Sequence, residues 1–391
     1  MELIRLALLV AFIPVAAPAA LPRVTLSRKV GSDVVTAPAA VGSSLALPST
    51  LIGAPPIVSG SLDKTAPTPS DKVVVPTPSA HNAIGHETEP GAYVSRLLAE
   101  TFSKLDGDVR LPEGSATGEI RRRVRRDLMN TALEAKDRSE ADTLRQVAVE
   151  IDKALPVIQA RLDSGEIDPQ LSVRVDPDAP AVKAPPRPVK IGFYPIAADP
   201  FQWGHLIIAL RAMGEVGLDQ IVFVLQGDDP IRKPTMTPAE IRHPMGQEVI
   251  NLFAPFFRYS PIARGTSFDG ETNIFRFMAL NSGVPIEGWY MVGDDHYRLV
   301  DKNGNPDTLP KLETNSQKDF GQDSSMHQIR VAFIERESPN HKIPTSLTVR
   351  FLSHVGFDVS SSMARGGRHD LVPYTALRYA RTHGLYGLNP N

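Results

Sequence analysis

The 391-residue chain contains no cysteine. This absence excludes disulfide scaffolds, thiolate metal sites and cysteine nucleophiles, and it suits an oxidising or exported setting. An excess of charge of either sign is also lacking, because 42 Lys and Arg residues stand against 44 Asp and Glu residues. The resulting net charge of −2 argues against a chain that binds nucleic acid or an anionic membrane with its whole surface.

A long hydrophobic run is lacking too. The apolar stretch 6–20 follows Arg5 and is interrupted by Pro14 and Pro18, so it is too short for a comfortable membrane span. Small residues at 16–19 resemble a signal-peptidase site. We therefore predict that residues 1–20 are a secretory signal cleaved near Ala19 or Ala20, with no stable membrane insertion afterwards. An uncleaved apolar anchor is the alternative.

Glycine-rich phosphate loops and dinucleotide fingerprints are absent, which disfavours P-loop ATPases and Rossmann oxidoreductases. Hydrophobic residues make up 42% and charged residues 22%, as in globular proteins. The 35 prolines divide the chain. The predicted parts after the signal are a disordered linker rich in Pro, Ala, Ser and Thr (21–90), a small helical region (91–168), a second Pro-rich linker (169–188) and a larger domain (189–391).

The helical region contains a run of arginines at 121–126, broken only by Val124. Such a run could bind a phosphate-rich partner. The alternative, which we favour, is a solvated helix face whose arginines pair with nearby Glu119, Asp127 and Glu134.

The larger domain alternates strand and helix patterns. Strands are predicted at 189–194, 220–225, 289–292 and 328–334, and helices at 206–213, around 247–253 and after Glu271. Strands separated by helices predict an α/β fold with a doubly wound parallel sheet, in which ligands bind at the carboxyl ends of the strands.

A polar loop follows the first predicted strand, and Gly204 and His205 then open an apolar helix. The first turn of a helix offers unpaired N–H groups and a positive dipole, both of which suit an anion. Glycine at position 204 would let the backbone approach a phosphate. Taken alone, this Gly-His pair equally fits a structural helix start.

The loop does not stand alone. Residues 199–206 (Asp-Pro-Phe-Gln-Trp-Gly-His-Leu) resemble the Asp-Pro-x-His-x-Gly-His-Leu signature of the α/β-phosphodiesterase nucleotidyltransferase superfamily. Further pieces resemble the nicotinate and nicotinamide mononucleotide adenylyltransferases in the same order along the chain. These pieces are 221–224 with Arg232 and Lys233, 239–245, 264–272, 292–295, 359–365 and 371–386, so the resemblance covers about 189–391.

The resemblance implies an enzyme of NAD biosynthesis that transfers an adenylyl group from ATP to a pyridine mononucleotide, with Mg²⁺ as companion and pyrophosphate as product. It implies that ATP is bound by Gly204, His205, Gly293, Asp294, Ser361, Ser362 and Arg365. It further implies that Arg264, Ser267, Phe268 and Asp269 hold the mononucleotide. Gln202, His205, Lys233 and Arg365 would act on the transferring phosphate. No protein ligand for a metal is expected, since Asp294-Asp295-His296 reads as a strand-end turn.

Two departures from the family pattern bear on function. Gln202 replaces the first signature histidine, and glutamine donates a hydrogen bond but carries no charge. Asp269 replaces a hydroxyl near the pyridine substituent, which would disfavour nicotinate. The alternatives are therefore a catalytically weakened nucleotide-binding relative, or another member of the superfamily such as a pantetheine-phosphate adenylyltransferase. Cellular location stays undecided, because the signal predicts export or the periplasm whereas the chemistry fits the cytoplasm. A homo-oligomer also stays open.

Overall fold

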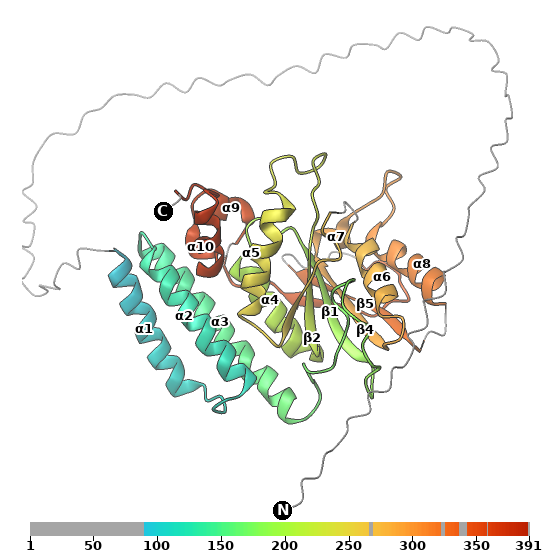
Figure 1. Cartoon of the computed structure of the whole chain (residues 1–391), viewed down its shortest axis with the longest axis horizontal. Coiled ribbons are helices and arrows are strands. Elements are labelled where there is room, and N and C mark those ends of the chain that lie inside the picture. The colour runs from blue at the N-terminus through green and yellow to red at the C-terminus, as the bar shows by residue number, and fades with distance from the viewer. Residues whose placement is uncertain (1–89, 266–268, 322–324, 336–341, 358, 390–391) are drawn as a thin grey trace, which may run out of the picture. The chain divides into compact units, whose positions relative to one another are not determined.

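A computed structural model describes residues 90–265, 269–321, 325–335, 342–357 and 359–389. The predicted signal at 1–20 and nearly all of the linker at 21–90 lie outside the described residues. The described residues form one compact unit. Figure 1 shows its helices and the sheet.

Every strand pairing in the sheet is parallel, and the strands lie in the order β3-β2-β1-β4-β5-β6. The chain first adds β2 and β3 on one side of β1. It then returns to the other side of β1 and adds β4, β5 and β6. The predicted doubly wound α/β fold is thus confirmed. The strands are β1 (Val189–Ile196), β2 (Gln220–Leu225), β3 (Phe257–Ser260), β4 (Ile286–Gly293), β5 (His327–Glu335) and β6 (Val349–Ser353).

Helices cover both faces of the sheet, and β2 shows why. Ile221 and Phe223 point into the core on one face, and Val222 and Val224 point into the core on the other. A strand buried on both sides reads as a continuous apolar run. The helical elements are α1 (Pro90–Asp108), α2 (Ala116–Leu133), α3 (Arg138–Asp163), α4 (Trp203–Ala212), η1 (Met213–Gly217), α5 (Ala239–Asn251), α6 (Gly270–Leu280), α7 (Asp295–Arg298), α8 (Thr308–Phe320), α9 (Ser361–Arg365), η2 (His369–Leu371) and α10 (Tyr374–Thr382).

The N-terminal helices α1, α2 and α3 lie side by side and form a further layer outside α4 (Figure 1). Their buried side chains belong to the same apolar cluster as α4, α5 and one face of the sheet. A Cβ atom at Gly214 of η1 would stand 3.3 Å from Val157 of α3, so the two elements are in direct contact. The parts of the chain before and after the predicted domain boundary at residue 188 therefore share one apolar core.

The arginine run at 121–126 is used within the helical layer. Arg121 and Arg125 both bind the buried Asp152 of α3, at 2.7 and 2.8 Å. Arg123 donates a 3.1 Å hydrogen bond to the carbonyl of Asn251, and Arg122 pairs with Glu119. The arginines thus pair within the protein, which is the alternative that we favoured. Most of their partners, however, are residues other than the predicted Glu119, Asp127 and Glu134.

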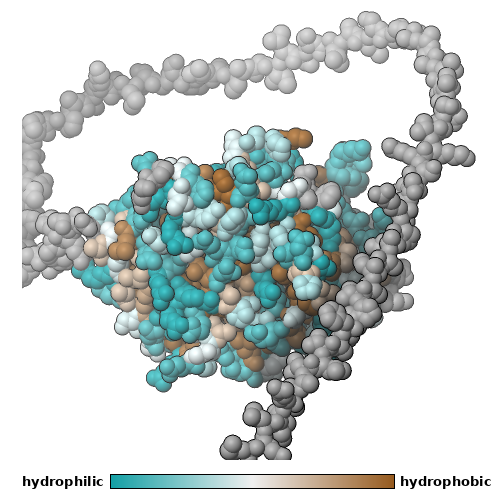
Figure 2. Space-filling view, viewed as in Figure 1, coloured by the Kyte–Doolittle hydropathy of each residue, from teal (hydrophilic) through white to brown (hydrophobic). Residues whose placement is uncertain are grey.

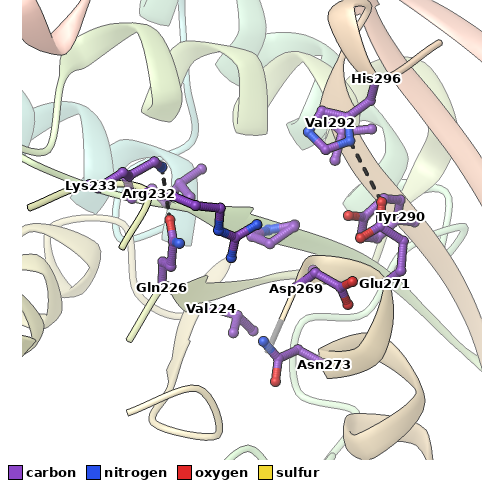
Figure 3. A pocket seen from close by; sticks show the side chains of 14 residues that line it. Val224, Gln226, Arg232, Lys233, Asp269, Glu271, Asn273, Tyr290, Val292 and His296 are labelled. Carbon is purple, nitrogen blue, oxygen red and sulfur yellow. Dashed lines mark hydrogen bonds and ion pairs between the residues drawn. The ribbon is translucent and has the colours of Figure 1, made fainter. Parts of the chain in front are cut away.

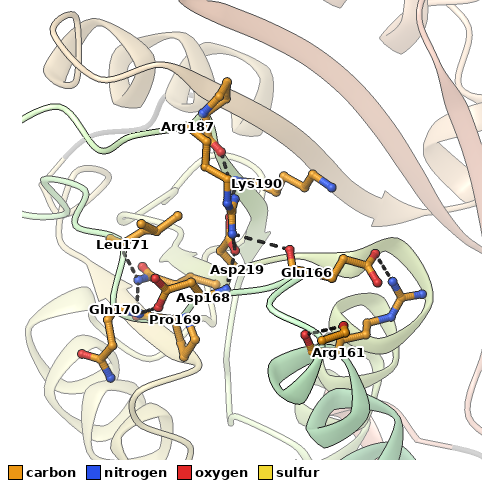
Figure 4. A network of polar contacts seen from close by, with 12 residues as sticks. Arg161, Glu166, Asp168, Pro169, Gln170, Leu171, Arg187, Lys190 and Asp219 are labelled. Atoms are coloured by element: carbon orange, nitrogen blue, oxygen red, sulfur yellow. Dashed lines mark hydrogen bonds and ion pairs between the residues drawn. The ribbon is translucent and has the colours of Figure 1, made fainter.

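The Pro-rich segment 169–188 follows an extended path but is bound to the sheet rather than loose. Leu171 and Val173 are buried in the core opposite the helical layer. The Arg187 guanidinium binds the buried Asp219 at 2.7 Å just before β2, within the network drawn in Figure 4. Gln220 donates to the carbonyls of this segment. Proline content therefore indicated the lack of regular structure correctly, and the expected disorder is wrong here because these side chains find partners.

Hydrophilic and hydrophobic residues are interspersed on the face shown in Figure 2. Within the described residues, no helix combines the length and the apolar character that a bilayer span requires.

Candidate active site

A cavity of about 260 Å³ opens at the carboxyl ends of the central strands. Pro195 and Ile196 of β1, Val224 of β2, and Tyr290 and Val292 of β4 form part of its wall. The strand order reverses between β1 and β4, and an open α/β sheet leaves a crevice at such a point. The cavity thus lies where the fold class places ligands.

The loop after β1 turns the chain sharply into α4. Ala198 has a φ of 52°, which is uncommon for a residue with a side chain. Gln202 precedes the first helical residue, and its backbone N–H donates to His205 Nδ1 at 3.3 Å. A neutral imidazole that accepts at Nδ1 carries its proton on Nε2. The His205 ring packs edge-on to Phe201 with centroids 5.5 Å apart, so its orientation is set before any ligand binds.

The Gln202 side chain joins two of the predicted ligand-binding segments. Its Nε2 donates a 2.6 Å hydrogen bond to Ser361 Oγ, although the two residues are 159 positions apart. Ser360 caps α9 by accepting from the Met363 N–H at 3.2 Å. The serine-rich segment therefore lies against the start of α4.

Arg365 also reaches the loop after β1. One guanidinium nitrogen donates to the Asp199 carbonyl at 2.6 Å, and another donates to Ser362 Oγ at 3.3 Å. The Arg365 side chain is 40% exposed, so it stands at the surface of the site with its orientation fixed.

Gly204 also has a packing role in the structure. A Cβ atom at this position would lie 2.6 Å from Val359 Cγ1. The missing side chain therefore makes room for the segment that leads to Ser361, so that packing explains this glycine without any phosphate.

Asp199 is a centre of the site that sequence reasoning did not select. Its buried carboxylate accepts a 2.8 Å hydrogen bond from the Tyr386 hydroxyl and a 3.2 Å bond from the Thr237 N–H. Arg365 lies 3.7 Å from the same carboxylate. Burial raises the pKa of Tyr386, so its hydroxyl stays a donor. The only sequence signal was the Asp-Pro of the signature itself.

Arg242 is a second residue of the site. It lies in one of the pieces that resemble the family, but no role was predicted for it. Its guanidinium is fully buried and donates to the carbonyls of Thr237, Ala197 and Gln226 at 2.5, 2.5 and 2.9 Å. It thereby ties the loops after β1 and β2 to helix α5. Burial lowers the pKa of neighbouring His243 to about 4, so this imidazole is neutral.

Two cations line one side of the cavity (Figure 3). Lys233 Nζ donates to Gln226 Oε1 at 2.9 Å, and partial burial lowers the pKa of this lysine. Arg232 Nε binds the Asp229 carboxylate at 2.6 Å. The structure thus places Lys233 in the cavity wall.

Acidic residues line the other side of the cavity (Figure 3). Asp269 caps α6 by accepting from the Thr272 N–H at 2.8 Å, and it forms an ion pair with Lys311 of α8. Burial alone would raise the pKa of Asp269, but these contacts hold it below its ordinary value. The carboxylate predicted to repel nicotinate therefore has a counter-ion, which comes from a helix that sequence reasoning did not connect to the site.

Glu271 and His296 form a second pair on this side, with 3.6 Å between Oε1 and Nδ1. The Glu271 carboxylate raises the pKa of His296. Burial would raise the pKa of Glu271, yet the imidazole keeps it below its ordinary value. Buried Tyr290 beside them has a raised pKa, first from burial and then from the two carboxylates. The pair is thus charged at mildly acidic pH.

Of the predicted site residues, only Lys233 and Asp269 line the cavity wall, and the others lie outside it or outside the described residues. Asp294 accepts from Arg298 at 3.1 Å at the end of β4, and a Cβ atom on Gly293 would collide with Asp295. Arg264 is exposed. Ser267 and Phe268 are not among the described residues.

Within the described ranges, no three His, Asp or Glu side chains are grouped as a metal site would require. A Mg²⁺ ion that accompanies ATP is bound mostly by phosphate oxygens and water, so the donor set here is compatible with one.

The sheet order and the cavity at its switch point define a doubly wound, parallel α/β fold with a candidate ligand site. No protein-family model matches the chain. A protein named probable nicotinate-nucleotide adenylyltransferase from Neisseria meningitidis serogroup A is 29% identical over 202 residues, which are 50% of this chain and 98% of that protein. A protein of the same name from Oceanobacillus iheyensis is 25% identical over 212 residues, 52% of this chain and 99% of its own length.

The resemblance to the nicotinate-nucleotide adenylyltransferases is thus confirmed over about half of the chain. The match takes in nearly all of each relative, so the other half of this chain has no counterpart in them. Among solved structures, the Plasmodium falciparum nicotinic acid mononucleotide adenylyltransferase complexed with APC overlays 52% of this chain and 100% of its own, at 13% identity and a TM-score of 0.36. A TM-score this low adds no support to the similarity found with the sequence relatives.

Proposed function

We propose that the chain is an adenylyltransferase that joins ATP to nicotinate or nicotinamide mononucleotide. An oxygen of the mononucleotide phosphate attacks the α-phosphorus of ATP, the bond to the β-phosphate oxygen breaks, and pyrophosphate leaves with the dinucleotide as product. No protein nucleophile takes part. Catalysis of this type rests on positioning the two phosphates and on stabilising negative charge.

The observation that carries the proposal is the 2.6 Å hydrogen bond from Gln202 to Ser361. It brings together the two segments to which the resemblance assigns the ATP phosphates, after the carboxyl end of β1. His205 would donate from Nε2 to a phosphate oxygen, and Arg365 would contact the polyphosphate. Lys233 lines the cavity and would add positive charge near the transferring group.

The cavity itself would hold the mononucleotide. Its cationic side suits a phosphate, and its acidic side with Asp269 and Glu271 suits the positively charged ring of a pyridine nucleotide. Lys311 and His296 balance these carboxylates, so both the nicotinate and the nicotinamide form remain candidates. A Mg²⁺ ion bound to ATP would supply further neutralisation of phosphate charge.

The test is pyrophosphate release by the full chain with ATP and each mononucleotide, alongside ATP alone. Release that depends on a mononucleotide, with the dinucleotide as product, supports the proposal. If ATP binds in calorimetry but no pyrophosphate is released with either mononucleotide, the adenylyltransferase proposal is wrong.

A catalytically weakened nucleotide binder is the second candidate, because the neutral amide of Gln202 already engages Ser361. Gln202→His separates the two candidates. If wild-type protein turns over slowly, an imidazole that can become cationic should raise the chemical rate more than it changes ATP affinity. If wild type and variant bind ATP and neither turns over, the binder is correct.

A further inference from the structure

The helical layer of α1, α2 and α3 precedes every motif on which the resemblance rests. It has no assigned role in the proposed reaction. Through α3 it packs on α4 and η1, and it has a second contact region around the end of α2 and the start of α3. There it meets the C-terminal segment that runs from Gly366 through η2 and α10.

Asp127 of α2 makes the tightest of these contacts. Its carboxylate is 4% exposed and accepts from the Tyr374 N–H at 2.7 Å, the Thr375 N–H at 3.0 Å and Thr375 Oγ1 at 2.5 Å. The first N–H groups of a helix lack partners within the helix, and a carboxylate is well suited to them. Pro373 precedes α10 and provides no side-chain cap. Asp127 therefore caps a helix 247 residues further along the chain.

Further contacts surround this cap. Glu134 binds Arg381 at the other end of α10, at 2.5 Å. Thr143 of α3 accepts a 3.2 Å hydrogen bond from Arg368, which is also paired with the buried Asp370. The helical layer thus holds both ends of α10 and the turn before it.

The held segment lies between two residues of the candidate site. Arg365 precedes it and donates to the Asp199 carbonyl, and Tyr386 follows it and donates to the Asp199 carboxylate. Tyr386 also lies 3.4 Å from Thr237, at the start of helix α5. Since both ends of the segment meet at Asp199, its placement fixes the loop between β1 and α4.

We propose that Asp127 and Glu134 are positioning residues for the ATP side of the site. By holding residues 366–381 they keep Arg365 and Tyr386 on Asp199, and so align the loop that leads to Gln202 and His205. The inference rests on the proposed function for the identity of the ligand. The helical layer, which precedes every motif of the resemblance, then helps to position the residues of the nucleotide site.

The test compares two buried carboxylates of the same layer in the full chain. Asp127→Asn keeps the size of the side chain but sets an NH₂ group against N–H donors. Asp152→Asn is the matched control, because the two ionic partners of Asp152, Arg121 and Arg125, both belong to α2 inside the layer. We expect Asp127→Asn to weaken ATP affinity about tenfold, with mononucleotide affinity changed less than about twofold. Asp152→Asn should leave both affinities unchanged, whatever its melting temperature.

The second arm uses the ion pair between Glu134 and Arg381. Glu134→Arg and Arg381→Glu should each weaken ATP binding, and the double variant should restore most of the affinity because the pair is re-formed with exchanged signs. Rescue of ATP affinity is not expected from a role in stability alone. Equal loss of affinity in the Asp127 and Asp152 variants, or no change in either, would overturn the inference.

Failure of the proposed function is distinguishable. If wild-type protein binds neither ATP nor a mononucleotide, the adenylyltransferase assignment fails. Amide hydrogen exchange then decides the positioning role. Loss of protection across 366–386 in Asp127→Asn but not in Asp152→Asn supports it, and equal protection in the two variants contradicts it.

Discussion

The two sides of the candidate site are stabilised in different ways. On the side of Gln202, His205 and Arg365, polar groups are held mainly by backbone carbonyls and hydroxyls, such as the Asp199 carbonyl that accepts from Arg365. On the side of Asp269 and Glu271, each carboxylate has a charged partner. Arg365 has a short contact with a neutral carbonyl and a longer ion pair, at 3.7 Å, with the Asp199 carboxylate, so more of its charge is available for an anionic ligand than in the close ion pair of Lys311 with Asp269. Under the proposed function, the first side would attract phosphate and the second would determine specificity.

Removal of His205 is expected to have the largest effect on this comparison. His205→Ala deletes an oriented donor from the phosphate side, and the loss of one preorganised donor typically costs about 10²–10³-fold in rate. We expect kcat to fall by this factor while mononucleotide affinity stays unchanged, as measured by steady-state kinetics and calorimetry. His383→Ala, at an exposed histidine, is the control. A fall of less than about threefold for His205→Ala would show that the ring has no role in the reaction.

Arg365→Ala tests whether the two sides bind different ligands. A charge-assisted contact contributes roughly 1.5–3 kcal/mol, so ATP affinity should fall about 10- to 100-fold with little change for the mononucleotide. Arg365→Lys should recover only part of the loss, because lysine lacks the planar fork. Arg378→Ala, at an exposed ion pair with Glu248, is the control. Equal losses for both ligands would contradict the division of the site.

Lys311→Met breaks the balance of charge on the acidic side. Without its counter-ion, Asp269 presents a negative charge to the cavity, and a carboxylate-bearing ligand should be disfavoured. We expect the affinity ratio of nicotinamide to nicotinate mononucleotide to rise about tenfold, and Asp269→Asn to lower it. Lys318→Met on the exposed part of the same helix is the control. An unchanged ratio in both Lys311 and Asp269 variants would place the base elsewhere.

The smallest expected effect concerns the pair of Glu271 and His296 and appears as stability against pH. Because the pKa of Glu271 is lowered in the folded protein, this carboxylate contributes to the free energy of unfolding above its ordinary pKa of 4.5. The contribution is lost as the pH falls below that value. The raised pKa of His296 gives stability that is complete below 6.5 and lost as pH rises through the raised value. The pair therefore contributes most between these values.

The free energies of unfolding of the wild-type protein and of His296→Gln, measured in urea, should thus differ most near pH 5.5 and least near pH 9. The difference should be about 1 kcal/mol or less, because the imidazole is partly exposed. A difference that grows with rising pH would contradict the charged pair.

Local patterns predicted the core of the α/β half well. The predicted strand at 220–225 coincides with β2, and the helix expected after Glu271 is present as α6. The strands β3 and β6 were missed because each is a short strand at an edge of the sheet, where fewer apolar residues are needed. Helix α8 was missed because its sequence is mostly polar, and only Leu309, Leu312 and Thr308 are buried.

The residues of the phosphate side were predicted from order along the chain, since Gln202, His205, Ser361 and Arg365 stand in short motifs. Their mutual contacts were not predictable. Neither was the role of Tyr386, which becomes a partner of Asp199 only through a hydrogen bond across 187 positions.

The sequence by itself determined the alternation of strands and helices and the motifs of a nucleotidyltransferase, because periodicity and turn chemistry act between neighbours in the chain. Only the tertiary structure decided which charges remain available. Lys311 neutralises Asp269. Asp127 caps α10 and so attaches the C-terminal segment to the helical layer. Ion pairs and caps of this kind join residues far apart in the chain, and their strength depends on distance and burial, which no local pattern encodes.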